Sequence, residues 1–136
     1  GDDHGRDQVV YGEMALDASG RLAAATSTGG KGFEQPGRVS DSGLPVGTYA
    51  TWEAAISCTG LGEDIIEEGL GVRILQRICD GVSLSRAFSV TFRELNARQR
   101  RAGAIGLDRH GRIAWATTLP LLFAIAQTPT RHLEDF

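Results

Sequence analysis

Apolar and polar residues alternate in two stretches near the beginning of the chain, and this alternation predicts β-strands. Residues 9–16 and 21–27 have the strand pattern, and residues 17–20 between them read Asp-Ala-Ser-Gly, a sequence typical of turns. We therefore expect a β-hairpin with a longer loop. Residues 102–108 and 112–117 repeat the pattern around an Arg-His-Gly turn and predict a second hairpin.

The spacing of apolar residues changes in the middle of the chain. Residues 52–58 are a strand candidate, and residues 63–80 then carry apolar positions at imperfect helical spacing, behind acidic residues that suit a helix N-terminus. We expect these acidic residues to be solvated and Gly81 to stop the helix. Ser83 is expected to cap a second helix over residues 84–101.

Strands are grouped along the chain, and so are helices. The order is hairpin, glycine-rich loop, strand, two helices, hairpin, which predicts an α+β fold with an antiparallel sheet packed on a helix pair. One side of that sheet would stay uncovered, so we expect a partner layer from another subunit or from a missing half. Residues 1–9 are expected to be a flexible lead-in to one domain over residues 10–136.

Composition and charge exclude several classes of protein. The chain has 136 residues, of which 41% are apolar and 23% charged, as in one ordinary globular domain. The net charge of −3 argues against a nucleic-acid partner, and the arginines at 98–101 are expected to serve the negative end of a helix dipole. The apolar run at 119–126 is too short to cross a bilayer, so no membrane partner is expected.

Cysteine and histidine usage bears on compartment and on metal binding. Cys58 and Cys79 lie in apolar patterns and are expected to be buried free thiols, with a disulfide as the alternative. Residues 1–9 show no signal-peptide pattern, which together with free thiols predicts a cytoplasmic protein. The chain has no CxxC or HExxH motif and its three histidines are scattered, so neither a metal site nor a cofactor is expected.

A glycine-rich stretch is the first candidate for chemistry. Residues 26–41 read TSTGGKGFEQPGRVSD, and their glycines would let the backbone approach a ligand closely. The planar guanidinium of Arg38 suits a carboxylate, and Asp41 suits an ammonium group. Together the two side chains would hold the head group of an α-amino acid. Taken singly, each signal is also typical of a turn or of a surface ion pair.

The second candidate lies at the end of the predicted middle strand, where residues 58–62 read Cys-Thr-Gly-Leu-Gly. The Thr59 hydroxyl and the backbone N–H groups of such a strand-to-helix turn suit an oxyanion. Plain helix capping is the alternative.

Four segments in a fixed order match a known family of hydrolases. They are ALDASGRLAAATSTGG (15–30), PGRVSDS (36–42), GTYA (47–50) and SCTGLGE (57–63). Through them, residues 10–62 resemble the β-subunit of plant-type L-asparaginases, also called isoaspartyl peptidases, which are N-terminal-nucleophile hydrolases. The helix pair and the closing hairpin resemble the family more loosely.

The resemblance implies a fold and a reaction. The fold would be half of an αββα sandwich, completed by an α-subunit or a homologous subunit. The family's precursor undergoes autoproteolysis before a threonine, which then attacks the side-chain amide of L-asparagine or a β-aspartyl peptide bond. The expected ligand is therefore a small amino acid or a β-aspartyl peptide.

The resemblance also implies a clamp for the substrate's head group. Gly30 would line the pocket through its backbone, and Arg38 would bind the α-carboxylate. Asp41 would bind the α-ammonium group, helped by the Gly62 carbonyl.

Three further positions would serve the reaction itself. Thr28 would orient the nucleophile, and the Thr59 hydroxyl and the Gly60 N–H would form the oxyanion hole. The nucleophile position falls on Val10, because VYGEMALD here stands where the family has TVGAVALD. Valine has no hydroxyl with which to attack a carbonyl or to begin self-cleavage, and residues 1–16 contain no Ser, Thr or Cys.

Three hypotheses follow from this sequence. The protein is a hydrolase whose attacking group is a water molecule or a residue of another chain. Alternatively, it is a catalytically inactive homologue, a pseudoenzyme that binds an amino acid. The third hypothesis is a non-catalytic subunit in an oligomer with an active homologue.

Overall fold

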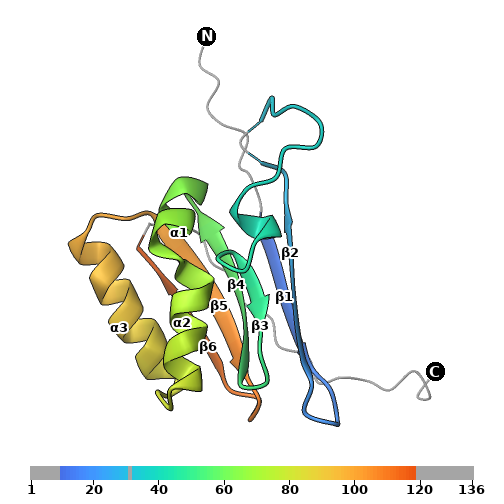
Figure 1. Ribbon diagram of the computed structural model, residues 1–136, viewed down its shortest axis with the longest axis vertical. Coiled ribbons are helices and arrows are strands. Elements are labelled where there is room, and N and C mark those ends of the chain that lie inside the picture. Colours follow the sequence, from blue (N-terminus) through green and yellow to red (C-terminus); the bar gives the residue numbers. More distant parts are fainter. Residues whose placement is uncertain (1–9, 31, 119–136) are drawn as a thin grey trace, which may run out of the picture.

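The protein is arranged in three layers, namely helices, a four-stranded sheet and a two-stranded ribbon (Figure 1). The computed structural model describes residues 10–30 and 32–118, so the predicted lead-in and the apolar run at 119–126 lie outside the described residues. The antiparallel sheet has the order β3-β4-β5-β6, with strands β3 (Thr48–Ala50), β4 (Ala54–Gly60), β5 (Ala102–Asp108) and β6 (Ile113–Thr117). The predicted α+β class, with an antiparallel sheet on a helix pair, is confirmed.

The ribbon is the predicted N-terminal hairpin, formed by β1 (Val10–Leu16) and β2 (Leu22–Thr28). Its register pairs Val10 with Thr28 at the open end and Leu16 with Leu22 at the turn. The turn forms because the Asp17 carboxylate accepts two backbone N–H groups and Gly20 takes a positive φ of 81°. The ribbon packs on the face of the sheet that the helices leave open (Figure 1).

Strand β4 sits between the ribbon and the helices, and its side chains alternate between them. Ala54, Ile56 and Cys58 belong to the apolar core under the helices. Ser57 points the other way, where its hydroxyl lies 2.6 Å from the Thr26 hydroxyl of the ribbon. By the same alternation, Thr59 lies on the ribbon side of the sheet.

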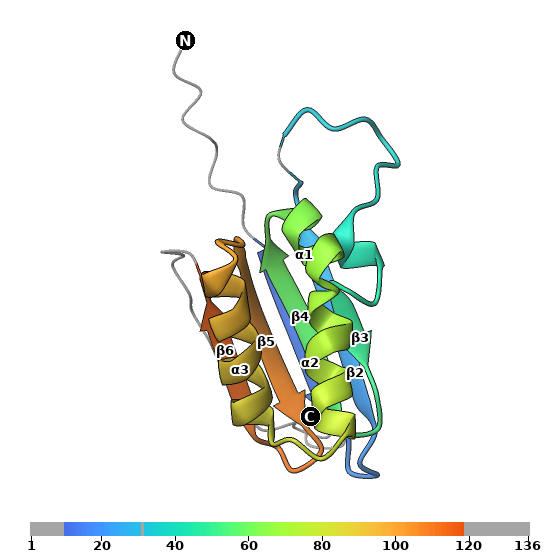
Figure 2. The same cartoon turned by 60° about the vertical axis from the view of Figure 1, so that its left-hand side comes forward.

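Three helical segments cover the other face of the sheet: α1 (Gly62–Glu68), α2 (Leu70–Cys79) and α3 (Leu84–Ala97). Segment α2 lies along β4 and β3, whereas α3 lies along β6 and β5 (Figure 2). Fully buried Ile65, Ile74 and Leu95 fill the space between helices and sheet. The predicted cap of α3 is confirmed, since the Ser83 side chain accepts the Arg86 N–H.

Several predicted boundaries are wrong. The first predicted helix is broken at Gly69, whose φ of 57° is left-handed, and this break accounts for the imperfect apolar spacing. The second helix ends at Ala97 rather than at residue 101. The middle strand covers 54–60 rather than 52–58, and the three-residue strand β3 was too short for the sequence pattern to reveal.

The acidic cluster at the start of the first helix is solvated only in part, since Glu63 and Glu67 are exposed as predicted. Asp64 and Glu68 are buried, and Arg98 donates to both carboxylate oxygens of Glu68 at 2.8 and 2.6 Å. Arg100 bridges Asp64 and Glu68. The basic cluster therefore neutralises buried acids of α1, and the last turn of α3 itself contains no basic residue. These hydrogen bonds, above all those from Arg98, hold the pKa of Glu68 below its ordinary value.

The two cysteines differ in environment. Cys58 is a buried free thiol, as predicted, but Cys79 is an exposed one, because the last turn of α2 leaves the core. No helix among the described residues has the length and apolar character needed to cross a bilayer.

Candidate functional site

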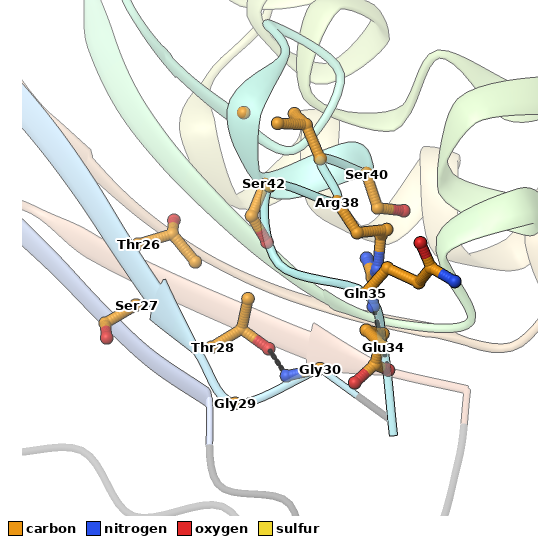
Figure 3. A pocket seen from close by; sticks show the side chains of 13 residues that line it. Thr26, Ser27, Thr28, Gly29, Gly30, Glu34, Gln35, Arg38, Ser40 and Ser42 are labelled. Carbon is orange, nitrogen blue, oxygen red and sulfur yellow. Dashed lines mark hydrogen bonds and ion pairs between the residues drawn. The ribbon is translucent and has the colours of Figure 1, made fainter. Parts of the chain in front are cut away.

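A pocket of about 490 Å³ opens where β2 ends and the glycine-rich loop begins (Figure 3). The loop rises beyond the strand ends and returns through the short 3-10 helix η1 (Asp41–Gly43) (Figures 1 and 2). Three predicted site residues line the pocket, namely Thr28, Gly30 and Arg38. Most of the remaining lining consists of hydroxyls and glycine backbone, which suits a small polar ligand.

Thr28 and Gly30 are joined by a local hydrogen bond. The Gly30 N–H donates to the Thr28 hydroxyl oxygen at 3.1 Å (Figure 3). Gly30 has a φ of 73°, which explains why a glycine stands there. The chain therefore turns sharply at the end of β2 and presents its backbone to the pocket.

Arg38 is positioned by a tight turn. Its backbone N–H donates to the Gln35 carbonyl at 3.1 Å, across a Pro-Gly pair in which Gly37 has a φ of 89°. Pro followed by a positive-φ Gly is typical of a type II turn. The turn brings the guanidinium of Arg38 to 3.0 Å from a carboxylate oxygen of Glu34, a residue that our sequence analysis did not single out. Opposite charges flanking a Pro-Gly pair were the signal that could have revealed it.

Asp41 lies beside Gly62 and is not among the residues that line the pocket. Its side chain is 9% exposed, and a Cβ placed on Gly62 would lie 2.9 Å from the Asp41 carboxylate oxygen Oδ1. Only glycine allows this approach. Burial above all, and then the charge of Asp41, raises the pKa of the Cys58 thiol far above its usual range. Asp41 thus lies between the start of α1 and the end of β4.

Thr59 and Gly60 end β4 and lie outside the lining of the pocket. Gly60 has a φ of 126°, and a Cβ there would lie 2.6 Å from the Arg101 carbonyl oxygen. The Leu61 N–H donates to that same oxygen at 2.9 Å, so the β4-to-α1 turn is fixed against the start of β5. Strands β2 and β4 end, and β1 begins, at the same end of the molecule (Figure 1).

Val10 stands at that end as well. It is half-buried and is the register partner of Thr28, so the two side chains share the face of the ribbon that is turned toward the sheet. The predicted residues thus form three groups. Thr28, Gly30 and Arg38 line the pocket, with Val10 opposite Thr28 in the ribbon. Asp41 lies beside Gly62, and Thr59 and Gly60 end β4 outside the pocket lining.

The donors that line the pocket are hydroxyls, backbone N–H groups, the Gln35 amide and the Arg38 guanidinium. In the described ranges 10–30 and 32–118, no three His, Cys, Asp or Glu side chains come together in a way that could hold a metal ion. The arrangement therefore suits recognition of a small ligand that carries a carboxylate.

Comparison with known proteins gives a consistent result. The family model described as Asparaginase matches residues 2–133. An isoaspartyl peptidase/L-asparaginase of a Nostoc species is 53% identical over 115 residues, which cover 85% of this chain and 36% of that protein. The Synechocystis protein of the same description is 50% identical over 121 residues, covering 89% of this chain and 37% of the relative.

A plant-type L-asparaginase of Pyrobaculum calidifontis is 41% identical over 113 residues, covering 79% of this chain and 37% of that protein. The chain thus spans about a third of the length of the curated relatives it matches.

Proposed function

Since the chain belongs to the asparaginase family, we propose that it carries the substrate-binding part of an L-asparaginase or isoaspartyl peptidase. The reaction is hydrolysis of the side-chain amide of L-asparagine, or of a β-aspartyl peptide bond. One observation carries the proposal. Arg38 and the backbone of Gly30 face a single pocket beside Thr28, at the strand end opposite Val10.

The clamp divides the head group of the substrate between two places. Arg38 offers N–H donors to the α-carboxylate from the loop side. Asp41 packs against Gly62. The Asp41 carboxylate and the Gly62 carbonyl are both hydrogen-bond acceptors, and each suits an ammonium group, which is donor only. The substrate's side-chain amide would then extend toward the start of β1 and the end of β4.

The oxyanion of the tetrahedral intermediate would form near the end of β4. The Thr59 hydroxyl and the Gly60 N–H are the donors, and the left-handed Gly60 backbone fixes the direction of its N–H. Attack on the amide carbonyl expels ammonia, and overall one water converts the amide into a carboxylate. Val10 has no hydroxyl for the attack, so the attacking oxygen comes from water or from another chain.

A second candidate function is binding without turnover. The observation that favours it is Val10 itself, because valine keeps the shape of threonine and packs in the ribbon without chemistry. In this case the clamp holds L-aspartate or L-asparagine as a ligand, and the protein acts through what it binds.

We also propose that an α-subunit or a homologous subunit covers this chain. Ala114 and Ala116 pack on the helix side, so Ile113 and Trp115 face the ribbon side of β6, where Trp115 is still 54% exposed. They extend an apolar surface with their cross-strand partners Ile105 and Leu107 of β5. A two-stranded ribbon over a four-stranded sheet leaves room for further strands beside β1.

The experiment uses the protein expressed from its whole gene. Mass spectrometry reports cleavage before residue 10, an ammonia assay with L-asparagine and a β-aspartyl dipeptide reports turnover, and calorimetry with L-aspartate reports binding. Ammonia release that is lost in Arg38→Gln supports hydrolysis. Binding without ammonia supports the second candidate. If the protein shows no binding and no turnover, both candidate functions are wrong.

A further inference from the structure

Glu34 places a carboxylate inside the proposed substrate clamp. One of its oxygens, Oε1, lies 3.0 Å from Nη2 of Arg38, and the other, Oε2, accepts the Gly32 N–H at 3.0 Å. A Cβ placed on Gly30 would lie 2.7–2.8 Å from the carboxylate carbon and oxygens of Glu34. The carboxylate therefore fills the space between Gly30 and Arg38.

This is the space that a ligand's α-carboxylate needs. A guanidinium holds a carboxylate through N–H donors, and the Glu34 carboxylate already uses one of those on Arg38. Since both side chains line the pocket, the ion pair belongs to the pocket wall rather than to a distant surface. The positive charge that would attract a ligand carboxylate is thereby balanced from within the chain.

The ion pair can open. The side chain of Arg38 is 34% exposed and that of Glu34 is 23% exposed. Ion pairs of this exposure contribute little free energy, because solvent screens them. A ligand that brings its own carboxylate can therefore displace Glu34, at a cost in affinity set by how often Glu34 occupies the arginine.

We propose that Glu34 is an internal competitor that occupies the α-carboxylate position on Arg38 until a ligand displaces it. This inference rests on the proposed function and identifies a residue that sets ligand selectivity. Only a ligand with a well-placed carboxylate restores a partner to Arg38 after Glu34 leaves. A ligand without an α-carboxylate gains no binding free energy by displacing Glu34 from Arg38.

The test is calorimetry on the protein expressed from its whole gene, with two probes. L-Aspartate carries the α-carboxylate, and its α-amide keeps the ammonium group and the side-chain carboxylate but lacks the α-carboxylate. The variants are Glu34→Gln and Glu34→Ala. Glu53→Gln is the matched control, because it removes the same charge at the β3–β4 turn, where Glu53 contacts Cys79.

If Glu34 holds Arg38 for about nine-tenths of the time, both Glu34 variants bind L-aspartate about tenfold more tightly, and the α-amide changes by less than about twofold. Glu53→Gln leaves both affinities unchanged. Unchanged or weaker L-aspartate binding in both Glu34 variants, with clear binding by the wild type, overturns this inference and leaves the proposed function standing. Absence of L-aspartate binding in wild type and variants alike overturns the two together.

Discussion

Val10 lies directly opposite Thr28 in the β1–β2 ribbon, so a valine side chain and a threonine hydroxyl share one face at the end of the strands. In the proposed site, Thr28 is the group that would orient a nucleophile, and Val10 is the position it would orient. If Val10 is the nucleophile position, as the proposal has it, Thr28 faces a side chain that has no oxygen to orient.

Val10→Thr restores a hydroxyl at this position. We expect the chain to cleave before residue 10 and ammonia release from L-asparagine to rise by about 10²-fold or more, because nucleophile replacements have effects of this size or larger. Mass spectrometry and the ammonia assay measure the two results. Val10→Ala is the control and should match the wild type. An uncleaved, inactive Val10→Thr protein would show that Val10 is not the nucleophile position.

Arg38→Gln removes the charge proposed to bind the α-carboxylate. We expect L-aspartate binding to weaken about 10- to 100-fold, since hydrogen bonds to charged groups contribute roughly 1.5–3 kcal/mol. Calorimetry measures the change. Arg86→Gln on the exposed side of α3 removes the same charge and should leave affinity unchanged. Equal affinities of wild type and Arg38→Gln would place the carboxylate elsewhere.

Gly60→Ala tests the turn that ends β4. An added Cβ meets the Arg101 carbonyl oxygen at 2.6 Å and also strains a backbone at φ 126°. We expect a loss of about 3 kcal/mol in the free energy of unfolding, from strain and overlap together. Gly20→Ala, with a φ of 81° and open space around it, should lose only about 1 kcal/mol. Urea denaturation distinguishes the two, and equal losses would contradict the packing at Gly60.

Glu68 gives the fold a dependence on pH. Its pKa is lowered below 4.5 in the folded protein, so its stabilisation is present above pH 4.5 and is lost as pH falls through the folded pKa. Glu68→Gln should cost about 2 kcal/mol at neutral pH, because buried arginine–carboxylate contacts are lost, and should flatten the acid limb. Urea titrations from pH 7 to pH 3 measure both. Glu67→Gln, at a side chain 60% exposed, should change little.

The elements that the sequence predicted well depend on local chemistry. The β1–β2 turn follows from Asp17 and Gly20, and the start of α3 follows from Ser83, because each needs only its immediate neighbours. The features that were predicted wrongly depend on residues far away in the sequence. Glu68 is buried because Arg98, thirty positions away, returns to cover it, and no pattern near Glu68 indicates this.

In the site, too, features that depend on local sequence were predicted, and features that depend on distant residues were not. Gly30 and Gly60 are glycines for backbone reasons that the sequence pattern suggested and the positive φ values bear out. The sequence resemblance also placed Asp41 with Gly62 and gave Arg38 a separate role, but spacing alone did not indicate that Asp41 would lie outside the lining of the pocket. The absence of a side chain at Gly62 leaves room for the Asp41 carboxylate.

Strand β1 pairs with β2 along one side, and within the described residues its other side carries no strand. Unpaired backbone N–H and C=O groups on such an edge can pair with further strands, and charged residues oppose this pairing. The β1 segment VYGEMAL has only one charged residue, Glu13. If the proposed subunit covers this edge, a shortage of that subunit would leave the edge open to other strands, and we expect the amount of folded protein in the cell to fall with it.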